Sequence, residues 1–146
     1  MPCWVFSYAQ ILHIEYKSNE GIRNLYHLSD EFIAVATKEI NEELTGISEI
    51  LNSCTSDEEL SANSENLQKH THKIKGLAPM MGKESLGDLA ALYDKILKQI
   101  ISGQSIPGLF EIMSNSVSDM NKAMTETSYD LSSVIAKTSG ILPSEK

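Results

Sequence analysis

Cysteine is scarce in this chain of 146 residues, and several other signals are missing with it. The two thiols, Cys3 and Cys54, lack the spacing of metal ligands and do not suggest a disulfide framework. No apolar run approaches the roughly 20 residues that a membrane-spanning helix needs. No segment alternates apolar and polar residues in the manner of a half-buried strand. We therefore expect a cytoplasmic protein without strands that does not engage a membrane.

Basic residues are also in the minority, with 12 Lys and Arg against 20 Asp and Glu and a net charge of −8. This balance argues against nucleic-acid binding through phosphate contacts. The charge is unevenly distributed, because residues 69–98 carry +3 and the remainder carries −11. A basic region on an acidic chain suits an acidic docking surface on a partner protein. The alternative is that these lysines only solvate the exposed faces of two helices.

Apolar residues recur at helical spacing in four segments. The pattern predicts helices over about residues 28–52, 57–82, 84–101 and 107–129 or beyond. Short connections between long helices favour antiparallel neighbours, so the expected fold is an all-α, up-down-up-down four-helix bundle. We expect one domain over 1–146 with its core at about 28–130. Residues 1–26 would add a short helix, and the tail 131–146 would extend the last helix or fray.

The inward faces of these helices are predicted from the same periodicity. They comprise Phe32, Val35, Ile40, Leu44, Ile47 and Leu51, then Leu60, Leu67, Ile74, Leu77 and Met81, then Leu86, Leu89, Tyr93, Ile96 and Ile100, and finally Leu109, Ile112, Met113, Val117, Met120 and Met124.

Helix ends are marked by residues with known terminal preferences. Ser29 is a predicted N-cap of the first helix, and Ser56 or Thr55 of the second. Pro79 should bend or end the second helix, because it lacks the N–H that bonds the carbonyl four residues earlier. Gly82 then supplies a left-handed stop.

The stretch from His72 to Gly82 is the most informative part of the chain. Lys75 and Gly76 lie three and four residues after His72, so on a helix both are beside the imidazole. The apolar residues of this helix fall on the opposite side. The pattern predicts an exposed histidine with a cation one turn away and no neighbouring side chain that would obstruct a large partner.

The string His-x-Ile-Lys-Gly, with a second glycine ten residues after the histidine, resembles the histidine phosphotransfer (HPt) domain of two-component signalling. The resemblance implies that His72 carries a phosphoryl group, which the domain exchanges with a response-regulator receiver domain or obtains from a histidine kinase. It implies no cofactor of the chain's own, since Mg²⁺ would be bound in the partner's acidic pocket.

Each residue of the motif has a chemical role in this interpretation. Imidazole is partly neutral near pH 7 and can attack phosphorus. Lys75 would balance the charge of the phosphoryl group, and Gly76 would let the partner's backbone approach closely. The remaining candidates for the receiver-docking surface are Gln68, Lys69, Lys73, Gly82 and Lys83.

Asp94 is the candidate for orienting the imidazole. His72 lies ten residues before Gly82 and Asp94 lies twelve after it, so antiparallel packing puts the two at about the same height. The resemblance supports this role, because chemotaxis kinases carry an imidazole-bonding glutamate 22 residues after the histidine. Aspartate is one methylene shorter, so its contact would be direct or bridged by water. The alternative is that Asp94 is an ordinary surface acid.

Three further possibilities stand beside the phosphorelay interpretation. A metal site at His70 and His72 is not expected, because residues two apart on a helix point about 200° apart. The likeness of Met80, Met81, Gly82 and Asp94 to chemotaxis kinases suggests a phosphate-accepting domain of such a kinase. The chain has no glycine-rich ATP-binding box, so we do not expect it to phosphorylate itself. From a different class, it could be a helical scaffold whose histidine is unused.

Overall fold

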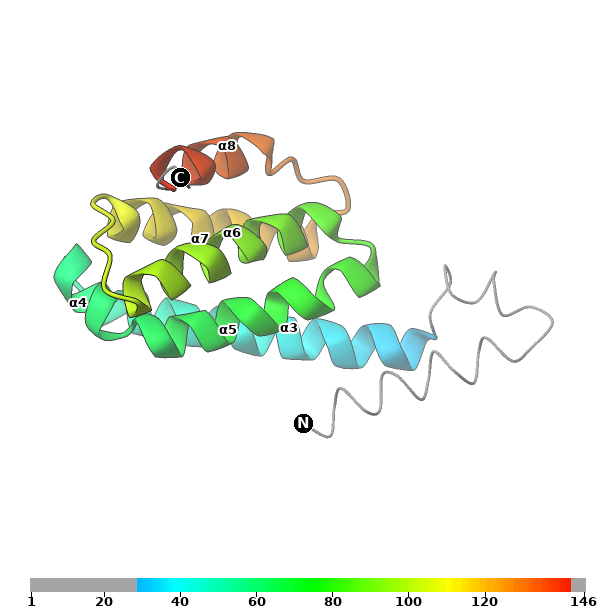
Figure 1. The fold of residues 1–146 in the computed structure, drawn as a ribbon. Coiled ribbons are helices and arrows are strands. Elements are labelled where there is room, and N and C mark those ends of the chain that lie inside the picture. The colour runs from blue at the N-terminus through cyan, green and yellow to red at the C-terminus, as the bar shows by residue number, and fades with distance from the viewer. Residues whose placement is uncertain (1–28, 143–146) are drawn as a thin grey trace. The chain divides into compact units, whose positions relative to one another are not determined.

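The computed structural model describes residues 29–142 and shows an all-helical protein, with no strand in that range (Figure 1). The expected N-terminal helix falls outside the described residues. The elements are α3 (Asp30–Asn52), α4 (Asp57–Ala62), α5 (Ser64–Leu77), a 3₁₀ turn η1 (Pro79–Met81), α6 (Glu84–Ile101), α7 (Leu109–Thr125) and α8 (Ser132–Ile141). The chain divides into two units after Ala36, and the candidate site lies in the second.

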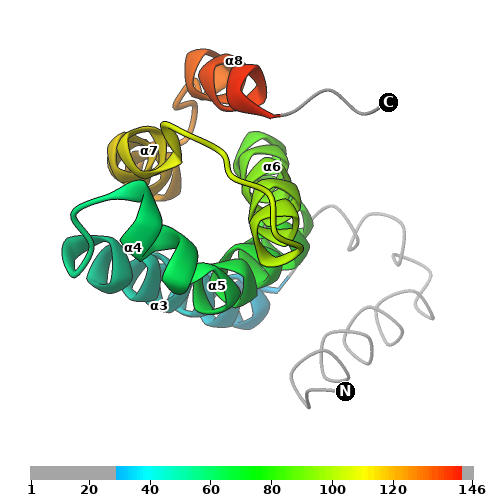
Figure 2. The same cartoon turned by 60° about the vertical axis from the view of Figure 1, so that its left-hand side comes forward.

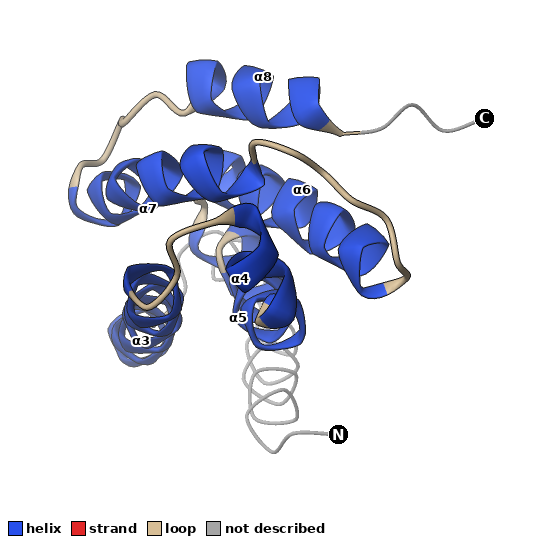
Figure 3. Cartoon of the chain, turned by 90° about the vertical axis from the view of Figure 1, so that its left-hand side faces the viewer, coloured by secondary structure: helices blue, strands red, loops and turns tan. Residues whose placement is uncertain are grey.

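Helices α5 and α6 form the main helix pair of this second unit. The colour gradient runs in opposite directions along them in Figure 1, so they are antiparallel, and the direction reverses again at α7 and at α8. In the view of Figure 2, α8 lies on the outer side of α6 and α7, and it contacts both. Figure 3 shows the loops that connect α6 to α7 and α7 to α8, whereas the connection between α5 and α6 contains η1. The short α4 contacts α5 and α7.

The predicted inward faces are largely confirmed. From Thr37 on, the following predicted core residues are buried: Ile40, Leu44, Ile47, Leu51, Leu60, Leu67, Ile74, Leu77, Leu86, Leu89, Tyr93, Ile96, Ile100, Leu109, Met113, Val117 and Met120. Val35 was wrongly placed, because the residue is 50% exposed. Met81, Ile112 and Met124, near helix ends or the edge of the stripe, are only half-buried.

The second predicted helix is not continuous, and the prediction of one helix over 57–82 was wrong. Ser56 caps α4 as expected, its Oγ accepting from the Glu59 N–H at 3.2 Å. The break comes at Asn63, whose φ is −105° and ψ is 11°. Its side-chain amide donates to the Glu59 carbonyl at 2.9 Å. A short polar side chain that bonds nearby backbone in this way competes with helix continuation, which explains the split into α4 and α5.

The turn between α5 and α6 has the predicted cause. The α5 helix ends at Leu77 with Ala78 as its C-cap, and Pro79 then opens the η1 turn. Gly82 adopts φ 80°, the left-handed conformation that favours glycine. A further glycine is needed here for space, because a Cβ at Gly87 would lie 2.6 Å from Pro79 Cγ.

The last predicted helix is also divided, into α7 and α8. It was expected to start at Pro107 and reach Tyr129, whereas α7 begins after Gly108 and ends at Thr125. The α7 N-terminus is capped from α4: the Asp57 carboxylate accepts from Gly108 N–H at 3.1 Å and Phe110 N–H at 2.8 Å. Periodicity within one helix cannot reveal a cap supplied by another.

Within the described residues, the tail after Tyr129 forms the separate helix α8 and does not extend α7. Leu131 at its start is buried, as is the Thr138 side chain. The buried Tyr93 hydroxyl of α6 hydrogen-bonds Ser116 Oγ of α7 and lies 3.3 Å from Thr138 Oγ1. Burial raises the pKa of the Tyr93 phenol, so it stays protonated and can donate in this contact of three helices.

Candidate functional site

His72 lies on α5 on the side opposite the buried apolar stripe. Its side chain is 58% exposed, whereas Leu67, Ile74 and Leu77 of the same helix are fully buried. The predicted exposure of the histidine is therefore confirmed. More than half of the His72 side-chain surface is therefore accessible from solvent.

Asp94 of α6 faces this histidine at the same height. Its carboxylate is only 3% exposed, and its Oδ1 lies 3.4 Å from His72 Nδ1. The separation is within ion-pair range and somewhat longer than an ordinary N–H···O bond of about 2.7–3.2 Å. The alternative that Asp94 is a surface acid is wrong, because α6 buries the residue against α5.

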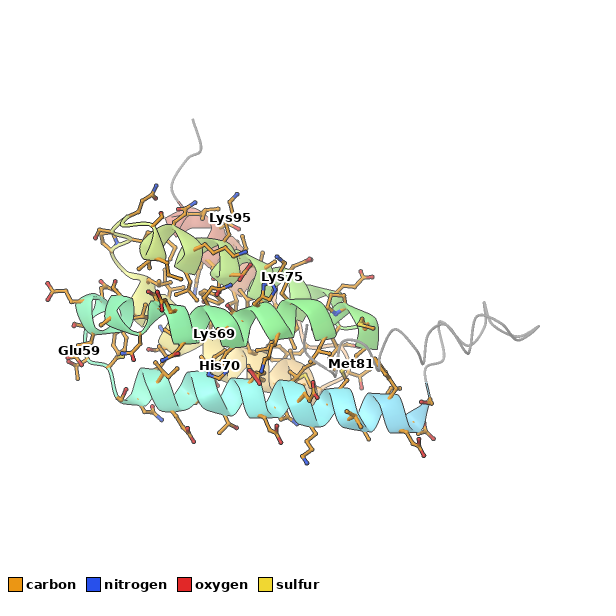
Figure 4. The ribbon with its side chains drawn as sticks, turned by 60° about the horizontal axis from the view of Figure 1, so that its bottom comes forward. Glu59, Lys69, His70, Lys75, Met81 and Lys95 are labelled. Carbon is orange, nitrogen blue, oxygen red and sulfur yellow. The ribbon has the colours of Figure 1, made fainter. Side chains whose placement is uncertain are left out.

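Three more side chains donate to the same carboxylate. The Gln68 amide nitrogen lies 2.6 Å from Oδ1, and the ammonium groups of Lys75 and Lys98 lie 3.3 Å and 3.1 Å from Oδ2. Figure 4 shows Lys75 on the side of α5 that faces α6. Burial raises the pKa of Asp94, but the bonds from Gln68, Lys98 and Lys75 outweigh it, so the pKa is below its usual value. Asp94 is thus an anion at neutral pH.

An ionised carboxylate can only accept hydrogen bonds, and this favours one tautomer of the neutral ring. The nitrogen that faces Asp94 is Nδ1, so the arrangement favours the proton on Nδ1. Nε2, on the other edge of the imidazole, then carries the lone pair. The site therefore combines an available nucleophilic nitrogen with a buried anion that can stabilise positive charge on the ring.

Lys98 was not among the residues predicted for the site, although its position held a usable signal. It lies four residues after Asp94 on α6, the spacing at which oppositely charged side chains meet on a helix. Lys98 and Lys75 share one oxygen of Asp94. If Lys75 turns towards another anion, Lys98 can keep that oxygen paired.

Gly76 leaves a gap beside the histidine. A Cβ built at this position would have no described atom within 4 Å, and the residue has no positive φ. Neither packing nor backbone conformation requires glycine here, while glycine within a helix costs stability. The effect of glycine at this position is to leave open surface next to His72.

The other residues predicted for docking have different surroundings. Lys69 is exposed on α5 (Figure 4), but Lys73 pairs across to Glu43 of α3, with Nζ 3.7 Å from Oε2. Gly82 is exposed in the turn. Lys83 is half-buried, and its ammonium donates to the Ala123 carbonyl of α7 at 2.9 Å. Gln68, also predicted for docking, is half-buried and donates to Asp94.

His70 and His72 face different helices, as their spacing predicts. His70 Nδ1 lies 2.8 Å from Glu43 Oε1, and Figure 4 shows the residue on the side of α5 that faces α3. The His70 ring also packs closely against Gly46 of α3, where an added Cβ would lie 2.5 Å from His70 Cε1. Over residues 29–142 no group of three or more His, Cys, Asp or Glu side chains is arranged to hold a metal ion.

Comparison with known proteins yields no relative: no protein-family model, curated protein or solved structure matches the chain. Within the part of the chain that the structure describes, no helix has the length and apolar character needed to span a membrane.

Proposed function

We propose that this chain is a phosphotransfer protein that accepts a phosphoryl group on His72 and exchanges it with the aspartate of a response-regulator receiver domain. The observation that carries the proposal is the pairing of an exposed imidazole, through Nδ1, with a buried ionised carboxylate. The resemblance of residues 72–82 to HPt domains supports the same function.

In the proposed reaction the Nε2 lone pair attacks the phosphorus of an aspartyl phosphate on the partner. The bond between phosphorus and the carboxylate oxygen breaks, its electron pair stays on the partner's aspartate, and a phosphorus–nitrogen bond forms at Nε2. The ring gains positive charge while its proton remains on Nδ1, opposite Asp94. Lys75 would then pair with the phosphoryl oxygens. The Mg²⁺ of the reaction would belong to the partner's acidic pocket.

The proposal includes the arrangement of the helices. In it, α3, α5, α6 and α7 form an antiparallel up-down-up-down four-helix bundle with α8 added outside. The alternating directions of the helices in Figure 1 support this topology. The function further implies a cytoplasmic protein that acts on protein partners, with neither nucleic acid nor membrane involved.

The partner surface is inferred from charge and space. Lys69 and Lys75 on α5 and Lys98 on α6 are exposed, and a Cβ at Gly76 would meet no described atom within 4 Å. A receiver domain, whose phosphorylation site is an acidic pocket, complements this positive surface. Such a surface steers association and makes its rate depend on salt concentration.

A second candidate is the phosphate-accepting domain of a chemotaxis-type histidine kinase. The specific observation in its favour is the acid at position 94, which reaches the imidazole. In that case the donor would be a kinase ATP-binding domain, and the receiver would only accept. Transfer from a phosphorylated receiver to His72 favours the relay, whereas transfer exclusively from a kinase favours this alternative.

The deciding experiment incubates the purified chain with a receiver domain that acetyl phosphate has phosphorylated. We expect acid-labile, alkali-stable phosphate on the wild-type chain and none on His72→Gln. A panel of receivers and kinases that never labels the wild type would mean that His72 is not used, and the helical scaffold would be the better description.

A further inference from the structure

Gln68 and His72 both approach the same oxygen atom of Asp94, but only Gln68 makes an ordinary hydrogen bond to it. They lie one turn apart on α5 and both face Oδ1 of Asp94, with Gln68 Nε2 at 2.6 Å and His72 Nδ1 at 3.4 Å. The amide must present its nitrogen here, because an ionised carboxylate offers no proton to an amide oxygen. The closer donor on Oδ1 is thus the amide rather than the imidazole.

The carboxylate has little freedom to move towards the ring. Its Oδ2 is held by Lys75 and Lys98, and its Oδ1 by Gln68. A buried carboxylate oxygen strongly favours having at least one donor, and Gln68 already meets this need. The imidazole is consequently the weakest of the four partners of Asp94, even though it is the group that would carry the chemistry.

We propose that Gln68 is a positioning residue that weakens the hold of Asp94 on His72, an inference that rests on the proposed function. When Nε2 bonds to phosphorus, the carboxylate stabilises the positive charge that develops on the ring. A competing donor on Oδ1 reduces that stabilisation, so Gln68 slows acceptance and keeps the phosphohistidine easy to discharge. A protein that both accepts and donates the phosphoryl group needs a phosphohistidine of such intermediate stability.

The substitution Gln68→Met tests this, because methionine has a similar length and offers no donor. With Gln68 gone, His72 is the only donor left on Oδ1 among these four groups, and Nδ1 should approach to ordinary hydrogen-bond distance. In ¹⁵N NMR spectra of the unphosphorylated protein, we expect a larger fraction of neutral rings with the proton on Nδ1. Asp94→Ala should lower that fraction below the wild-type value.

The double variant distinguishes this role from a general structural one. If Gln68 acts through Asp94, Gln68→Met should have no effect on the tautomer in the Asp94→Ala background. Asn66→Leu, which removes an exposed amide from the same helix, is the matched control and should leave the ring unchanged. An unaltered tautomer in Gln68→Met would overturn the inference.

Labelling with phosphoramidate then measures phosphoryl acceptance without partner docking. We expect Gln68→Met to accept several-fold faster than wild type, and Gln68→Met with Asp94→Ala to match Asp94→Ala alone. Equal or slower acceptance by Gln68→Met, with a labelled wild type, refutes the role of Gln68 and leaves the proposed function intact. If neither phosphoramidate nor any receiver labels the wild type, the proposed function fails and the role of Gln68 falls with it.

Discussion

His72 Nδ1 lies 3.4 Å from Asp94 Oδ1, although the histidine side chain is 58% exposed and that of the aspartate only 3%. One edge of the ring is therefore in contact with a buried anion while the other is open to solvent. A partner that binds the open edge does not have to displace the carboxylate. The two edges of the ring thus have different surroundings, and this difference suits the proposed phosphoryl transfer.

Replacement of His72 should abolish labelling without unfolding the protein. We expect His72→Gln to carry no acid-labile phosphate and to change the free energy of unfolding by less than about 0.5 kcal/mol, as is usual for exposed side chains. Urea unfolding and phosphate labelling measure the two effects. His70→Gln is the control and should keep its label, because that ring faces Glu43. If His72→Gln were still labelled, the phosphorylated residue would have to be a different one.

Gly76 should separate docking from chemistry. Gly76→Ala should raise the free energy of unfolding by up to about 1 kcal/mol, because alanine favours the helix and the structure has room for its Cβ. Gly76→Gln should block transfer from a receiver domain and leave labelling by phosphoramidate nearly unchanged. Equal loss with both donors would mean that the bulky side chain disturbs His72 itself.

The low pKa of Asp94 predicts a pH dependence of stability. Because the folded-state pKa lies below the unfolded value of about 3.9, Asp94 stabilises the fold fully above that pH. The contribution should be lost as the pH falls through the folded pKa. The free energy of unfolding of Asp94→Asn should therefore depend less on pH below about 4 than that of wild type. Parallel curves for the two proteins would contradict the assigned ionisation.

The Tyr93 hydroxyl should contribute to the docking of α8. Tyr93→Phe removes its contacts with Ser116 and Thr138, whose hydroxyls keep bonds to the Ile112 and Val134 carbonyls. We therefore expect a loss of only about 1 kcal/mol in the free energy of unfolding. Amide hydrogen exchange in α8 should become faster than in α5. Unchanged exchange in α8 would show that apolar contacts alone hold this helix.

Asp57 should stabilise α7 although it belongs to α4. Asp57→Ala removes the acceptor of the Gly108 and Phe110 N–H groups and should cost about 1 kcal/mol, the usual value of a helix cap. Glu58→Ala, an exposed acid of the same first turn, is the control and should cost much less. Similar losses in both variants would indicate a dipole effect on α4 instead of a cap on α7.

Local sequence determined the features that depend on near neighbours along the chain. The bounds of α6, the end of α5 before Pro79 and the left-handed Gly82 follow from periodicity, a missing N–H and glycine's freedom at positive φ. The exposure of His72 opposite Leu67 and Ile74 follows from the 3.6-residue repeat. Even the height of Asp94 opposite His72 could be counted from the turn between their helices.

Tertiary structure alone decided which groups meet across helices. Nothing near Gln68 in the sequence indicates that its amide approaches Asp94 more closely than His72 does, and nothing near Asp57 indicates a cap on α7. The break at Asn63 depends on a side-chain bond that competes with a backbone bond, a balance that residue types do not settle. Such contacts depend on the rotation and separation of packed helices, so they are set by the whole core and not by the segments that supply the partners.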